Sequence, residues 1–225
     1  MATSSDKARG DKSLRKDYSE GAWQLMVAAE KLFGRHGIEA VSLREIAATA
    51  NHANNSAVQY HFGSKENLVQ AVFEMRMPKL EAARAQHLAN ARSMGKLSLR
   101  ALLCALLLPV LEVFDDQALE NYVLFNTRLT HRDTGDHPFF RAAAISPASI
   151  EIYDEIQKLF SQMPKEAFSI RMRLASDLFL DSVAEWKRLK TVKVNPYRDD
   201  QVFWDDVINM ALAIMQTPLA AQKKK

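Results

Sequence analysis

Side chains that can donate and accept hydrogen bonds gather in one short segment, residues 54–65, which reads NNSAVQYHFGSK. The segment contains no carboxylate, although 25% of the chain is charged. Amide, hydroxyl, phenol and imidazole groups can all bond to an anionic surface, and a missing carboxylate removes the repulsion that such a surface would feel. We therefore interpret this segment as one that faces a polyanion.

Short helical patterns surround the polar segment and must position it. From residue 19 apolar residues recur at helical spacing as far as Phe33, and two glycines then end the pattern. Ser42 precedes a second, short helix and is followed by Glu45, which is a capping-box signature. The asparagines after residue 50 predict a turn, and a third short helix runs from about residue 54 or 55 to Tyr60. Ser64 then caps a fourth helix.

Two short helices joined by a tight turn and braced by a longer helix form a helix-turn-helix module. The second short helix of such a module is thin enough to enter the major groove of DNA and read base edges. In the third predicted helix Asn55, Ser56 and Gln59 share one face, whereas Val58 and Phe62 share the opposite, apolar face. Asn and Gln suit paired contacts with adenine, and Ser suits donors or acceptors. The pattern predicts a DNA-reading helix.

Residues from about 22 to 71 resemble the DNA-binding domain of the TetR family of bacterial transcriptional regulators. The motifs AAEKLFGRHGIEAVSLREIAATA and YHFGSKENL carry this resemblance, which covers about the first third of the chain. It implies that residues 51–60 hold the turn and the reading helix, that helix two approaches the DNA backbone or groove edge, and that the YHF region anchors phosphates. The predicted DNA-binding residues are Ser42, Arg44, Asn54, Asn55, Ser56, Gln59, Tyr60, His61 and Lys65.

One position departs from the commonest form of this family. Asn51 stands where the family usually has a glycine, and the stretch between helix two and the YHF motif is one residue longer. Which of Asn54, Asn55 and Ser56 points straight at the bases is therefore left open.

Helical patterns continue along the whole chain and predict an all-α protein. Only seven glycines and seven prolines occur, which leaves room for long uninterrupted helices. Pro78 and Pro109 predict a kink or break in two of them. We expect a disordered arm over residues 1–18, a three-helix helix-turn-helix DNA-binding domain over 19–74, a larger helical effector-binding and dimerisation domain over 75–217, and a tail over 218–225.

The resemblance implies that the larger domain binds a small molecule and that its last two long helices pack against a second copy of the chain. Between residues 169 and 190 the apolar residues spread beyond one face, so that helix needs a partner besides its own core. The predicted dimer contacts are Leu174, Leu178, Val183 and Trp186.

A ligand pocket in the larger domain would be lined by some of its aromatic residues and methionines, most of which must be core. Polar groups near those apolar stretches could orient a hydrophobic or amphipathic ligand. The candidate ligand-binding residues are His87, Asn121, Tyr122, Phe125, Asn126 and Arg128.

Other functions find less support in the sequence. No Gly-rich phosphate loop, nucleophile elbow or spaced set of metal ligands is present, so we expect neither an enzyme nor a cofactor nor a metal. A loop with His131, Asp133, Asp136 and His137 has no template that would fix a metal. A net charge of +3 argues against DNA binding that rests on phosphate neutralisation alone.

Neither a signal peptide nor an apolar run long enough to span a bilayer is seen, and Cys104 stands alone, which predicts a cytoplasmic protein with no membrane partner.

The sequence thus predicts a ligand-responsive transcriptional regulator, most often a repressor in this family. It would bind a palindromic operator in double-stranded DNA as a homodimer and be released by a small hydrophobic or amphipathic effector. The alternatives are an architectural protein that binds DNA without sequence preference and a helical enzyme.

Overall fold

A computed structural model describes residues 18–52, 54, 56–95, 97–130, 138, 142, 145–192 and 195–219. Asn55, the polar loop from 131 to 137, the tail from 220 and the predicted arm apart from Tyr18 lie outside the described residues. Every regular element within the described ranges is a helix, which confirms the all-α prediction. None of the described helices is both long and apolar enough to cross a membrane.

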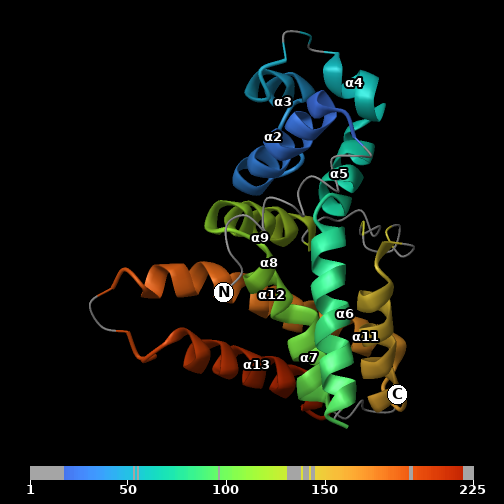
Figure 1. Ribbon diagram of the computed structural model, residues 1–225, viewed down its shortest axis with the longest axis vertical. Coiled ribbons are helices and arrows are strands. Elements are labelled where there is room, and N and C mark those ends of the chain that lie inside the picture. The colour runs from blue at the N-terminus through green and yellow to red at the C-terminus, as the bar shows by residue number, and fades with distance from the viewer. Residues whose placement is uncertain are drawn as a thin grey trace, which may run out of the picture.

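The first four described helices form the N-terminal part of the molecule, at the top of Figure 1. Three of them begin at a serine whose Oγ accepts a hydrogen bond from a backbone N–H three residues later, as at Ser19, Ser42 and Ser64. Such caps satisfy amides that a helix leaves unpaired, so the sequence itself sets where each helix starts. The helices are α2 (Glu20–His36), α3 (Leu43–Thr49), α4 (Ala57–Phe62) and α5 (Lys65–Glu74).

A larger helical part follows, in which α6 stands upright beside α7 and α11, while α12 and α13 lie side by side (Figure 1). Its helices are α6 (Met77–Ser93), α7 (Leu99–Leu107), α8 (Pro109–Val113), α9 (Asp116–Thr130), α11 (Pro147–Leu159), α12 (Lys165–Leu189) and α13 (Asp200–Gln216).

The two predicted breaks fall at the two prolines. Pro78 lies in the first turn of α6, just after α5 has ended at Glu74, and Pro109 begins α8 after α7 has ended at Leu107. Proline lacks the N–H that a helix interior needs but fits the first turn, where that group would be unpaired.

The two parts meet along α2 and α9, whose backbones approach closely at Gly34. A Cβ atom at Gly34 would lie 2.8 Å from the Leu124 Cβ and 3.0 Å from the Phe125 backbone nitrogen. Beside it, the Phe33 and Phe125 rings stack with their centroids 6.3 Å apart. Helix α9 thus supports the N-terminal part through α2.

We expect Gly34→Ala to destabilise the protein. Alanine in place of glycine inside a helix normally stabilises by about 1 kcal/mol, but here the added methyl group overpacks the α2–α9 contact, which costs about 1–3 kcal/mol. Urea unfolding measures the difference. Lys31→Ala, on the exposed side of the same helix, serves as the control and should change stability by less than about 0.5 kcal/mol. A more stable Gly34→Ala protein would contradict the close approach.

Candidate nucleic-acid interface

The turn between α3 and α4 is built from asparagines, as the sequence predicted. Asn51 adopts a φ of 58°, the left-handed conformation that glycine and asparagine tolerate best. The Asn54 side chain then accepts a hydrogen bond of 2.8 Å from the Ser56 backbone N–H, which closes a small side-chain turn. The turn leads directly into α4, whose N-cap is Ser56.

Helix α4 divides its side chains between core and surface. Ala57, Val58 and Phe62 are buried, whereas Gln59 and Tyr60 point outward. Tyr60 is 84% exposed, which is exceptional for so large an aromatic ring. The predicted reading helix therefore presents polar and aromatic groups that its own domain leaves uncovered.

Four other predicted DNA-binding residues are described, and they fall into two groups. Ser42 and Arg44 are exposed at the start of α3, with the Ser42 hydroxyl engaged as the cap. His61 and Lys65 are only partly exposed. Lys65 donates a 3.2 Å hydrogen bond to the Glu39 carbonyl, so part of its bonding capacity is used within its own domain.

One histidine beside the predicted interface was missed by the sequence interpretation. The His52 Nε2 atom is buried and has no hydrogen-bond partner among the described residues. Its ring lies 6.4 Å from the His61 ring, and its Cε1 atom would be 3.0 Å from a Cβ at Gly21, in the first turn of α2. Folding thus places the start of α2 beside the end of α4, a tertiary contact that no local pattern signals.

The candidate ligand-binding residues make contacts within the chain. The Asn126 side-chain amide donates to the Tyr122 backbone carbonyl at 2.8 Å, and the Asn121 Oδ1 atom accepts from the Gln117 side-chain amide at 3.3 Å. The Phe125 ring packs on Phe33 of α2. All four α9 candidates other than Arg128 are buried, including Tyr122.

The other two candidates make polar contacts elsewhere. The His87 Nε2 atom lies 3.0 Å from a Glu112 carboxylate oxygen. Arg128 points to the Gly34 carbonyl at 3.5 Å.

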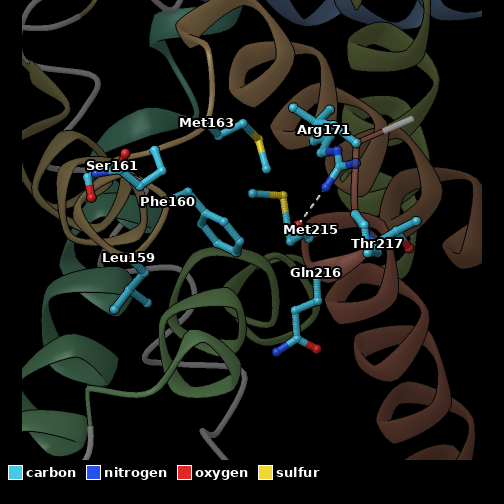
Figure 2. A pocket seen from close by; sticks show the side chains of 11 residues that line it. Leu159, Phe160, Ser161, Met163, Arg171, Met215, Gln216 and Thr217 are labelled. Carbon is cyan, nitrogen blue, oxygen red and sulfur yellow. Dashed lines mark hydrogen bonds between the residues drawn. The ribbon is translucent and has the colours of Figure 1, made fainter. Parts of the chain in front are cut away.

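A cavity of about 320 Å³ lies elsewhere, where α11, α12 and α13 end or begin. Phe160, Met163 and Met215 form its apolar wall, and the Arg171 guanidinium donates to the Met215 carbonyl at 2.9 Å (Figure 2). None of the candidate ligand-binding residues lines this cavity.

The predicted dimer contacts on α12 separate into outward and inward residues. Leu174 is 44% exposed and Leu178 is half-buried, so both leave apolar surface for a partner. Val183 and Trp186 are buried in the chain's own core, and the Trp186 ring stacks on Phe203 of α13 with centroids 4.5 Å apart. The Trp186 side chain thus holds α12 to α13, and both buried side chains have little area left for a second copy.

Comparison with known proteins bears on the N-terminal part. Residues 25–72 match the family model described as bacterial regulatory proteins, tetR family. Among solved structures, the crystal structure of the multidrug binding protein EbrR complexed with imidazole is similar over 92% of this chain and 95% of that chain, with 16% sequence identity and a TM-score of 0.39. No curated protein matches the sequence.

Asn51 offers a direct test of the turn. We expect Asn51→Ala to destabilise the protein by about 1 kcal/mol, because alanine resists the left-handed conformation. Asn51→Gly should be neutral or slightly stabilising, because glycine adopts that conformation freely. Thermal and urea unfolding of both variants measure the difference, and equal stabilities would contradict the positive φ.

Proposed function

Since the chain is a member of the TetR family of bacterial regulatory proteins by its N-terminal domain, we propose that it is a ligand-responsive transcriptional repressor that binds a palindromic operator as a homodimer. The observation that carries this proposal is the exposed, carboxylate-free face of α4, anchored by its buried side. In the proposed division of the chain, residues 19–74 bind DNA and residues 75–217 bind the effector and dimerise.

In this proposal α4 enters the major groove and reads bases through Gln59, with Ser56 beside it. A glutamine amide can bond to both exposed groups of adenine, which is worth about 1–3 kcal/mol of discrimination. Tyr60 is the best-exposed candidate for holding a phosphate, with Arg44 on the neighbouring helix. Phosphate contacts fix the position of the protein on DNA, and base contacts select the sequence.

Dimerisation is proposed through the outward faces of α12 and α13. Ile170 and Leu174 lie one turn apart on α12 and are 51% and 44% exposed, and Met210 on α13 is 39% exposed. These two helices already pack against each other, so a second copy would complete a four-helix arrangement. The symmetry of such a dimer would present two reading helices to successive major grooves, about 34–36 Å or a longer multiple apart.

The effector is proposed to be a small hydrophobic or amphipathic molecule that releases the DNA. Helix α9 is the element best placed to transmit its binding, because α9 holds both the buried candidate residues and the contact with α2. Such a ligand can shift the orientation of the DNA-binding domain only by binding one orientation more tightly than the other.

Selection of bound duplexes from a random pool, followed by affinity measurements, tests the reading of DNA. We expect a palindromic consensus, and we expect Gln59→Ala to lose roughly tenfold in affinity for it while keeping its affinity for random DNA. The matched variant Tyr60→Phe removes only a hydroxyl on the same helix and should weaken both duplexes alike, by loss of a phosphate contact.

If Gln59→Ala left the selected sequence unchanged, the proposed orientation of α4 in the groove would be wrong. Equal affinity of the unmodified protein for selected and random duplexes would support an architectural protein instead.

Leu174→Glu tests the proposed dimer face. We expect this change to give monomers at micromolar concentration, because a charge would be buried without a partner in the dimer but exposed in the monomer. Sedimentation velocity measures the outcome. Leu159→Glu, at an exposed leucine on α11, is the control and should leave the dimer intact. If the Leu174→Glu variant still formed a dimer, the interface would have to lie elsewhere.

A charged substitution of Trp186 would not test the dimer face, because Trp186 is buried and the charge would disrupt the chain's own core.

A further inference from the structure

An ion pair joins the DNA-binding domain to the α5–α6 junction. Glu30 on α2 is completely buried, and Arg76 holds both of its oxygens, with Nε–Oε1 at 2.9 Å and Nη2–Oε2 at 2.5 Å. Burial raises the pKa of Glu30, and the hydrogen bonds and charge of Arg76 oppose that rise. The two residues therefore depend on each other, because a buried carboxylate without its partner is strongly unfavourable.

From Arg76 the contacts continue into the larger domain. The Arg76 guanidinium lies over the Phe114 ring, 5.5 Å from its centroid, and the Phe114 ring packs on Tyr122 with centroids 5.0 Å apart. The Tyr122 side chain is buried, and the charge of Arg84 on α6 opposes the rise in the pKa of Tyr122 that burial causes. The contacts from Glu30 to Tyr122 are packed or bonded. Helix α6 itself carries both Arg76, at its N-cap, and Arg84.

Helix α6 also carries two members of a buried polar cluster formed by Glu81, Arg84 and Ser149. The Arg84 guanidinium donates to the Ser149 hydroxyl at 2.9 Å, to Glu81 at 3.2 Å and to the Leu106 carbonyl at 3.0 Å. Glu81 also bonds to the Ser149 hydroxyl. Its other oxygen accepts from the backbone N–H groups of Ala148 and Ser149, at 2.9 and 3.1 Å. A carboxylate from α6 thus caps the first turn of α11.

Helix α11 has a second capping group of its own. Ser146 occupies its N-cap position, where a serine hydroxyl ordinarily accepts those same amides. In this structure the Ser146 hydroxyl is buried and has no partner among the described residues, and its ψ of 44° is outside the extended range of a capping serine. Buried hydroxyls without a partner are rare and unfavourable. The Glu81 carboxylate therefore accepts hydrogen bonds from two amides that the Ser146 hydroxyl could accept in its place.

We propose that α11 exchanges its cap between Glu81 and Ser146, and that this exchange controls the orientation of the DNA-binding domain. In the observed state Glu81 caps α11 and α6 is tied to α2. In the alternative state Ser146 caps α11, and α6 is free to move with its polar cluster. The exchange regulates the proposed binding of DNA and rests on that function. Helix α6 connects the two ends, because it carries Arg84 in the polar cluster and, at its N-cap, Arg76, which holds Glu30 of α2.

Amide hydrogen exchange of α2, measured by mass spectrometry on the full chain without DNA, tests the proposal. Glu81→Gln weakens the observed cap and should speed amide exchange in α2 by more than about twofold. A change at a distant site with no connection to α2 should alter the exchange rate there by no more than about twofold. Ser146→Ala removes the alternative cap and the unpaired hydroxyl, so it should leave thermal stability unchanged or raised and α2 exchange unchanged or slower. Arg76→Met interrupts the connection, so adding Glu81→Gln to Arg76→Met should not speed α2 exchange further.

Arg92→Ala is the matched control. It removes another α6–α11 contact, the exposed 2.6 Å ion pair with Glu151, which is not connected to α2, and it should leave α2 exchange unchanged. If Glu81→Gln does not fold, Ser149→Ala replaces it with the same expected direction. Exchange that changes only in α6 and α11, a Ser146→Ala protein that is less stable or faster in α2, or an equal effect of Arg92→Ala would each overturn the proposal.

The readout requires neither an operator nor an effector, so its failure is separate from failure of the proposed function. If no duplex were selected, the proposed regulator would be contradicted. If amide hydrogen exchange in α2 were unchanged, only the proposed switch of caps would be contradicted.

Discussion

Helix α2 packs both against α3 and α5 of the DNA-binding domain and against α9 of the larger domain, and the arrangement of the molecule depends on this double burial. Its buried residues include Phe33 and Gly34, which lie at the contact with α9. Only Gln24, Val27 and a few charged residues of this helix remain exposed. A helix that is covered on most of its sides cannot rotate without disturbing both neighbours. The DNA-binding domain is therefore held in place by the same helix that builds it.

Local signals in the sequence predicted the elements well because they act within a few residues. Serines at the helix starts accept amides three residues away, and the two prolines stand in the first turn of the helix that follows each break, where the missing N–H would be unpaired. The outward face of α4 also followed from spacing, since Val58 and Phe62 had to be inside. These features need no knowledge of what lies across the core.

Contacts between distant residues could not be predicted in this way. The apolar width of α12 indicated an additional partner, but spacing did not show that α13 supplies that partner for Trp186. Glu81 and Arg84, three residues apart on a helix, have the spacing of an ordinary exposed ion pair, yet folding buries both against α11. Their role depends on a helix that begins more than sixty residues later in the chain.

The shortness of α4 has an evolutionary consequence. A helix of six residues is not stable alone, so its existence rests on the residues that its inner face buries. Its outward residues bury little and contribute little to folding. Under the proposed function, stability and sequence preference are therefore encoded at different positions of one short helix and its N-cap. A lineage could acquire a new target site by exchanging Ser56 and Gln59, without first having to survive a less stable protein.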